Sequence, residues 1–285
     1  MGRVELVVDQ AKGVAVLTRS VGRFDVVALR DAVGPFDSWV RLFPDATSAD
    51  WERARRLDPD AFGADGVWQL EFRCFVIRPP GGETILVDTG VGPGGSPASS
   101  WAPVPGRLPA ELVAAGVDVE EVDTVVLTHL HADHGGWAVA PGGVPMFPNA
   151  RYVVQHAEVA ALESGADPML AYAVRPLQAA GQLDEVDGEA RLVAERRGGT
   201  VTVVPTPGHT VGHQSVLVED GRDRLVITGD VLVHAVQLVD PEVAYEYEQD
   251  PVVARRTRVR LLERARADRA WLATMHLSEP FIQAH

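Results

Sequence analysis

The chain of 285 residues has one cysteine, Cys74, and one lysine, Lys12. A single thiol cannot form an internal disulfide, and it cannot supply the several thiolates of a cysteine-rich zinc module. No apolar run approaches the roughly 18 residues that a membrane helix needs, and the first ten residues lack the apolar core of a signal peptide. We therefore expect a cytoplasmic protein with no membrane partner.

Positive charge is also scarce, because 26 lysines and arginines face 40 aspartates and glutamates, which gives a net charge of −14. Such a chain repels phosphate backbones, so nucleic acid is excluded as its main partner. The hydrophobic share of 46% is sufficient for a large core. With no repeat or low-complexity segment, we expect a single domain over residues 1–285 that binds a small-molecule substrate. A homodimer is left open.

Short apolar segments alternate with turn residues along the chain. The pattern predicts strands at 68–77, 84–87, 124–127, 151–155, 200–205, 214–218, 224–228 and 271–274. It predicts helices at 109–115, 156–164 and 251–267, the last capped by Asp250. Six arginines between positions 255 and 266 predict an exposed charged face on that last helix. The fold class is α/β, with sheets covered by helices.

Four metal-binding side chains lie within six residues where one predicted strand ends: His129, His131, Asp133 and His134. Alternating strand positions place the first two histidines on one side, and a turn would bring the other two residues to the same spot. Imidazole and carboxylate are good ligands for divalent metals such as zinc. The cluster could serve two ions about 3.5–4 Å apart.

Three further candidates follow other predicted strands. His209 comes after Pro-Gly, Asp230 comes after Gly229, and His276 follows the last strand. Each has an ordinary explanation when it is taken alone, as a loop histidine, a turn aspartate or a tail histidine. Together with the first cluster they complete a set of seven ligands.

The blocks HLHADHGG at 129–136, PGHT at 207–210, TGD at 228–230 and MHL at 275–277 resemble, in order, the ligand blocks of the metallo-β-lactamase-fold hydrolases. The resemblance covers residues 67–277 and implies a four-layered αβ/βα sandwich. It implies that His129, His131 and His209 hold one metal, that Asp133, His134 and His276 hold a second, and that Asp230 bridges both. Zinc is the expected ion, although iron, manganese and cobalt accept the same ligands.

Within that family the chain looks like the quorum-quenching N-acyl-homoserine lactone lactonases and the methyl-parathion-type hydrolases. This likeness implies a dinuclear hydrolase in which a hydroxide between two cations attacks the carbonyl of a lactone or ester. Asp133 or Asp230 would orient the hydroxide and pass a proton to the leaving oxygen. Phosphotriester and β-lactam substrates stay open for the same hydrolase. Two other classes of protein also stay open: a non-catalytic binding module, and a mononuclear iron dioxygenase, which the complete second ligand set disfavours.

One position departs from the lactonase pattern. Those enzymes carry a tyrosine three residues after the bridging aspartate, whereas this chain has Val233 followed by His234. We expect His234 to donate to the substrate oxygen instead, with Tyr245 and Tyr247 as other sources of a donor. Residues 34–66 and 163–198 are least family-like; they are left as lids or a dimer surface, and Phe43 and Trp51 of the first segment are expected near the pocket.

Three residues outside the ligand set also receive an expectation. Asp88 is expected to brace a turn or a ligand histidine. His213 is expected to pack beside the PGHT loop. Cys74 is expected to be a small buried apolar residue.

Overall fold

The computed structural model describes the chain except residues 1–3, 10–13, 197 and 285. A first sheet holds eight strands in sequence order, and a second holds six in the order β14-β13-β12-β11-β10-β9. The first consists of β1 (Val4–Asp9), β2 (Val14–Val21), β3 (Phe24–Ser38), β4 (Val67–Arg78), β5 (Ile85–Val87), β6 (Thr124–Val126), β7 (Arg151–Gln155) and β8 (Leu183–Val186). The second consists of β9 (Ala190–Ala194), β10 (Thr200–Pro205), β11 (Gln214–Asp220), β12 (Asp223–Ile227), β13 (Trp271–Ala273) and β14 (Phe281–Gln283).

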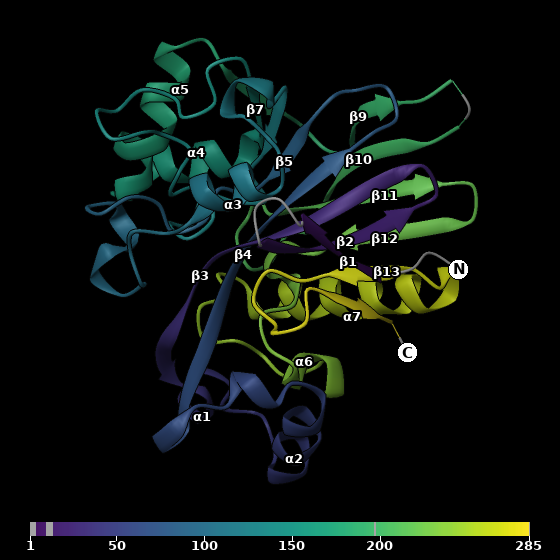
Figure 1. The fold of residues 1–285 in the computed structure, drawn as a ribbon. Coiled ribbons are helices and arrows are strands. Elements are labelled where there is room, and N and C mark those ends of the chain that lie inside the picture. Colours follow the sequence, from purple (N-terminus) through teal and green to yellow (C-terminus); the bar gives the residue numbers. More distant parts are fainter. Residues whose placement is uncertain (1–3, 10–13, 197, 285) are drawn as a thin grey trace.

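Helices cover the outer faces of both sheets and one end of the molecule (Figure 1). They are α1 (Trp39–Leu42), α2 (Ser48–Leu57), α3 (Leu108–Ala114), α4 (His156–Ser164), α5 (Arg175–Ala179), α6 (Val236–Val239) and α7 (Pro251–Asp268). Short 3-10 turns are η1 (Pro59–Ala61), η2 (Ala64–Gly66), η3 (Pro97–Ser100), η4 (Val119–Glu121) and η6 (Gly229–Val231), and η5 (Leu170–Val174) is a π-helix. Among the described helices, none combines the length and apolar character that crossing a bilayer requires.

The layers follow from strand alternation. Val125 packs into the core beneath α3, α4 and α5, whereas its neighbour Val126 packs into the core between the two sheets. On the far side, Leu262 of α7 packs against Leu272 of β13. The three cores lie between four layers: the helices α3 to α5, the first sheet, the second sheet and α7. The predicted αβ/βα sandwich is therefore confirmed (Figure 1).

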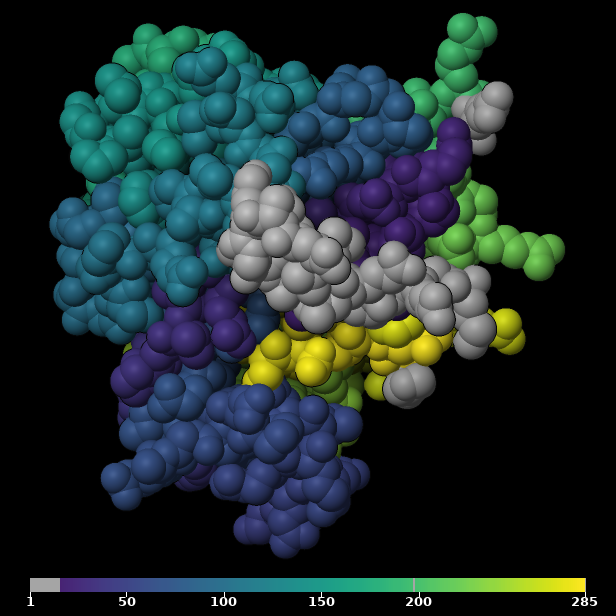
Figure 2. All heavy atoms as spheres, in the orientation of Figure 1, coloured from purple at the N-terminus to yellow at the C-terminus, as the bar shows by residue number. Residues whose placement is uncertain are grey.

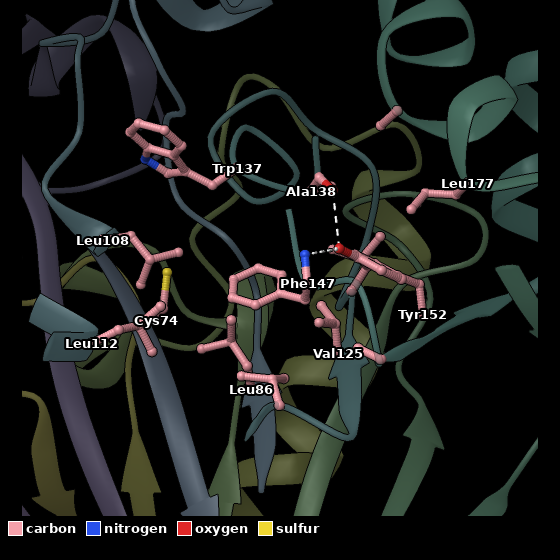
Figure 3. Packing of buried hydrophobic residues seen from close by; sticks show 14 of the residues in the cluster. Cys74, Leu86, Leu108, Leu112, Val125, Trp137, Ala138, Phe147, Tyr152 and Leu177 are labelled. Atoms are coloured by element: carbon pink, nitrogen blue, oxygen red, sulfur yellow. Dashed lines mark hydrogen bonds between the residues drawn. The ribbon is translucent and has the colours of Figure 1, made fainter. Parts of the chain in front are cut away.

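The core beneath α3 also settles the status of Cys74. Its side chain is fully buried among apolar residues, as expected, and burial raises the pKa of its thiol (Figure 3). In the same core the Tyr152 hydroxyl accepts a hydrogen bond from the Phe147 amide at 3.1 Å and donates one to the Ala138 carbonyl at 3.0 Å. This hydroxyl ties down the loop that follows the first ligand cluster.

The two segments left open by the sequence have defined structures. Residues 34–66 complete β3 and then form α1, α2, η1 and η2, which make the dark-blue lobe at the bottom of Figure 2. Residues 163–198 end α4 and form η5, α5, β8 and β9, so they supply one edge strand to each sheet. The three N-terminal strands were not predicted.

The predicted charged face of α7 is wrong at one position. Arg258 is fully buried, and its guanidinium pairs with the equally buried Glu248 at 2.6 Å. The same side chain donates to the carbonyls of Pro241 and Val243, at 2.9 and 2.8 Å. These bonds join the loop after α6 to α7. They also compensate the guanidinium for the water that it loses on burial.

We expect Arg258→Leu to lower the free energy of unfolding by about 3–5 kcal/mol, because it leaves the Glu248 carboxylate buried without its partner. Urea unfolding of the metal-loaded protein measures the change. The matched control is Arg260→Leu on the exposed face of the same helix, which should change the free energy by less than about 0.5 kcal/mol. Equal effects of the two substitutions would contradict this role for Arg258.

Candidate metal centre

The seven predicted ligands come from four loops, each of which follows a strand. His129, His131, Asp133 and His134 follow β6; His209 follows β10, Asp230 lies in η6 after β12, and His276 follows β13. The structure brings all seven together as two groups, and within each group the ligand atoms lie within 4.8 Å of one another.

The first group contains His129, His131, His209 and Asp230. The Nδ1 atom of His131 lies 3.0 Å from Nε2 of His129 and 3.0 Å from Nε2 of His209. Oδ2 of Asp230 lies 3.1 Å from the same His209 atom and 3.8 Å from the His129 atom. Four donor atoms therefore converge on one point.

The second group contains Asp133, His134 and His276. The Nε2 atoms of the two histidines lie 3.3 Å apart, and Oδ2 of Asp133 lies 3.5 Å from Nε2 of His134 and 3.8 Å from Nε2 of His276. Oδ1 of Asp230 lies 3.2 Å from His134 and 3.1 Å from His276. The two oxygens of Asp230 are thus divided between the groups.

These spacings fit metal ions. Donor atoms about 2.1 Å from a tetrahedral ion lie about 3.4 Å from one another, and the distances within each group scatter around that value. Oδ1 of Asp230 is buried, and its nearest described neighbours include the Nε2 atoms of His276 and His134, at 3.1 and 3.2 Å. A buried carboxylate oxygen that faces two imidazole nitrogens, all of them metal-binding atoms, is the arrangement expected around a cation.

The ligand side chains of the two groups differ in charge. Burial lowers the pKa of His129 and His209 well below the usual value, which leaves both rings neutral and able to ligate. Burial alone would raise the pKa of Asp230, but His134, His276 and His209 hold it well below its usual range. Burial lowers the pKa of His134, yet the carboxylates of Asp230, Asp133 and Asp88 together outweigh burial and leave that pKa raised.

Asp88 orients a ligand histidine, as expected. Its Oδ2 accepts a 2.7 Å hydrogen bond from Nδ1 of His134, so the opposite ring nitrogen faces the second group. The carboxylate also accepts from the amide and the hydroxyl of Thr128, at 2.7 Å each. Asp88 itself has a left-handed backbone, with φ of 59°. One buried side chain therefore links the end of β5 to the ligand loop after β6.

His213 supports the backbone of Asp230. Its Nε2 accepts from the Asp230 amide at 2.9 Å, so its proton lies on Nδ1, which donates to the Thr206 hydroxyl at 2.9 Å. Burial lowers the pKa of His213 to about 4, which keeps the ring neutral. A Cβ at Gly229 would lie 2.5 Å from the ring, so glycine is required there. His213 packs beside the PGHT loop, as expected, and it also positions Asp230.

Sequence reasoning missed Glu158 of α4. Its carboxylate accepts from the Leu130 amide at 3.0 Å and from the Gly212 amide at 2.9 Å, and so clamps two ligand loops together. A Cβ at Gly212 would lie 2.3 Å from the Glu158 backbone. An acidic residue in the first turn of a helix carries no sequence signal for such a role, because its partners lie 28 and 54 residues away.

Sequence reasoning also missed the support of His276. Its Nδ1 donates to the Glu71 carbonyl at 2.6 Å, which directs Nε2 toward the second group. The buried Arg73 guanidinium donates to the carbonyls of Leu277 and Ser278 and pairs with the Glu71 carboxylate at 3.2 Å. Strand β4 therefore holds the C-terminal ligand in place.

His234 lies in a box of aromatic rings. The centroids of Phe43, Trp51, Phe62 and Trp68 are 5.1–5.6 Å from its ring. Burial lowers its pKa to about 3, and its Nδ1 accepts from the Val236 amide, so Nε2 carries the proton. That nitrogen is buried without a hydrogen-bond partner among the described residues. Phe43 and Trp51 thus contact His234, and no described ring contact joins them to a metal ligand.

Tyr245 lies nearer the ligands. Its ring stacks on His209 with centroids 6.1 Å apart and planes at 11°. Its other ring neighbours include Phe43, 5.1 Å away. Tyr245 therefore stands between the aromatic box and the first group.

Comparison with known proteins gives a family and several relatives. A family model described as the metallo-beta-lactamase superfamily matches residues 73–276. An atrochrysone carboxyl ACP thioesterase from Aspergillus fumigatus is 30% identical over 175 residues, which are 60% of this chain and 43% of that protein. The N-acyl homoserine lactonase AttM of Rhizobium radiobacter is 29% identical over 187 residues, 55% of this chain and 62% of that protein.

Among solved structures, the hydrolase AbOPH of the beta lactamase superfamily superposes with a TM-score of 0.74. It is 26% identical, and the match covers 93% of this chain and 91% of that one. The chain spans about half the length of the two curated relatives, at 43% and 62%.

We expect Asp88→Asn to weaken metal binding at the second group by about 10- to 100-fold, because an amide nitrogen cannot accept the His134 proton. Asparagine tolerates the left-handed backbone, so the turn should survive. Competition with a chromophoric chelator measures the affinity of each site. Asp184→Asn, at an exposed ion pair, is the control. Loss of both ions together, or of neither, would contradict the assignment.

Proposed function

This chain belongs to the metallo-beta-lactamase superfamily, and we propose that it is a dinuclear metal-dependent hydrolase that opens lactones or cleaves related esters. The observation that carries the proposal is the division of the Asp230 carboxylate, with one oxygen 3.1 Å from His209 and the other 3.1 Å from His276. Two cations that share a carboxylate suit hydrolysis of acyl and phosphoryl compounds.

We propose zinc as the ion in both groups, because nitrogen and oxygen donors at tetrahedral spacing suit it well; iron, manganese and cobalt would use the same donors. Divalent ions bound there would acidify water and polarise a carbonyl oxygen. His129, His131 and His209 would hold one ion, Asp133, His134 and His276 the other, and Asp230 both.

The chain's own residues supply the proton chemistry. Asp133 is the more exposed of the two carboxylates, so it would carry a proton from the attacking water to the leaving oxygen. Asp230 is ionised and held by its backbone, so it would keep its position through the reaction. The Nε2–H group of His234, which has no partner among the described residues, would donate a hydrogen bond to the substrate oxygen.

The substrate is proposed to be a small acyl compound. The lactonase and thioesterase relatives are both named for reactions at an acyl carbon, which favours a lactone first and a thioester second. Phosphotriesters and β-lactams need the same chemistry, but neither relative is named for them.

We expect the zinc-loaded protein to open simple lactones at neutral pH, since the proposed centre supplies the nucleophile. A pH-stat measures acid release. A chelator should abolish turnover, added zinc should restore it, and Asp230→Asn should lower kcat by at least about 100-fold. Turnover that survives full removal of metal would contradict the proposal, as would failure with every lactone, ester and thioester offered.

We expect His234→Phe to lower kcat by about 100-fold with little change in KM, because phenylalanine fits the aromatic box but donates no hydrogen bond. Tyr245→Phe is the paired variant, since it removes the other nearby donor while keeping the ring on His209. The opposite pattern, with a loss in the tyrosine variant and none in the histidine variant, would contradict the role of His234.

A further inference from the structure

Helix α7 covers only part of the outer face of the second sheet. It packs on β13, whereas Val204 of β10 and Leu217 of β11 are half-buried and belong to none of the apolar cores found among the described residues. Their strand neighbours Val203 and Val216 point into the core between the sheets, so alternation directs Val204 and Leu217 outward. An apolar strip is left uncovered beside α7.

A groove of about 530 Å³ lies between this strip and α7. Val226 of β12 and Leu261 of α7 also line it. The lining on α7 extends from Val253 to Asp268, about 22 Å along the helix axis at about 1.5 Å per residue. None of the seven predicted metal ligands lines the groove, so it is a cavity separate from the metal centre.

The groove is rich in arginine, although the whole chain has a net charge of −14. Its lining contains four arginines and three carboxylates. Arg224 donates to Glu219 at 2.6 Å, and Arg264 donates to Asp268, so these four charges are paired within the lining. The two other arginines therefore decide which charge a ligand of the groove should carry.

Those two arginines are Arg256 and Arg260, which lie one turn apart on α7 and are exposed. Within the described part of the chain neither has an ion-pair or hydrogen-bond partner, and Glu189, the third carboxylate of the lining, has no ion-pair partner either. A solvated arginine is ordinary by itself. Here two of them flank an apolar floor, which is the arrangement that an anion with an apolar tail requires.

We propose that this groove binds a single-chain amphiphile with an anionic head, such as a medium-chain fatty acid. Arg256 and Arg260 bind the carboxylate, because a guanidinium presents a planar fork of donors that matches its two oxygens. The alkyl chain lies on Leu217, Val226 and Leu261. The site does not depend on the proposed hydrolysis.

The size of the groove favours a slim molecule over a partner helix. Its volume of about 530 Å³ lies within the range of about 300–1,000 Å³ that small-molecule sites span. A helix about 10 Å across that filled the same length would need roughly 1,700 Å³. A single alkyl chain therefore fits where an inserted helix does not.

The first test is calorimetry on the zinc-loaded protein with decane-1-sulfonate below its micelle-forming concentration, because a sulfonate is a weak ligand for zinc. We expect one saturable site per chain, and binding at least about tenfold weaker for decyltrimethylammonium. The net charge of −14 alone would favour the cation. Butane-1-sulfonate should bind at least about 100-fold more weakly than the decyl compound. A preference for the cation, equal affinity of the two sulfonates, or no saturable binding would overturn the inference.

The second test removes the two unpaired charges. We expect the double variant Arg256→Gln/Arg260→Gln to bind decane-1-sulfonate about tenfold more weakly, because two charged contacts are lost. The matched control is Arg255→Gln/Arg175→Gln, which removes the same charge from exposed ion pairs outside the groove and should keep the affinity of wild type. Equal losses in the two double variants would overturn the role of the groove.

The third test locates the ligand. Methyl NMR spectra of the zinc-loaded protein, recorded while decanoate is added, should show shifts at Val204, Leu217 and Leu261. Leu130 and Leu277 are neighbours of metal ligands in the sequence and report on the metal centre. Shifts at these two leucines without shifts in the groove would overturn the inference. Shifts in the groove support it whether or not the protein hydrolyses any lactone, so its outcome is separate from that of the proposed function.

Discussion

The structure depends on the contacts that the Asp230 carboxylate makes with histidines of both ligand groups. Its two oxygens face two groups of ligands, and each oxygen has a histidine nitrogen 3.1 Å away. A buried acceptor among so many imidazoles is tolerable only where positive charge compensates it. The fold meets this requirement by ending four strands, from two different sheets, at one place.

Loops that carry ligands need outside support, and in this protein buried polar side chains provide it. Asp88 turns His134, His213 holds the Asp230 amide, and Glu158 joins two loops. Arg73 and Arg258 act in the same way on the loops around His276 and after α6. Each makes several hydrogen bonds, because a half-satisfied buried group would destabilise the site that it supports.

Four ligands could be predicted from sequence because they lie within six residues after an apolar strand, and His209, Asp230 and His276 because each follows another predicted strand. Strand β3 could not, because it is buried on both faces for much of its length and contains Gly34 and Pro35, so no clean alternation marks it. The burial of Arg258 and the clamp made by Glu158 depend on partners from other elements, which local patterns do not reveal.

The central claim is that two ions share Asp230. Anomalous diffraction from crystals of the zinc-loaded protein, recorded on both sides of the zinc absorption edge, tests it most directly. The account predicts two peaks, one on each side of the Asp230 carboxylate, ligated by the two groups of histidines and Asp133. A single peak, or peaks away from this carboxylate, would contradict it.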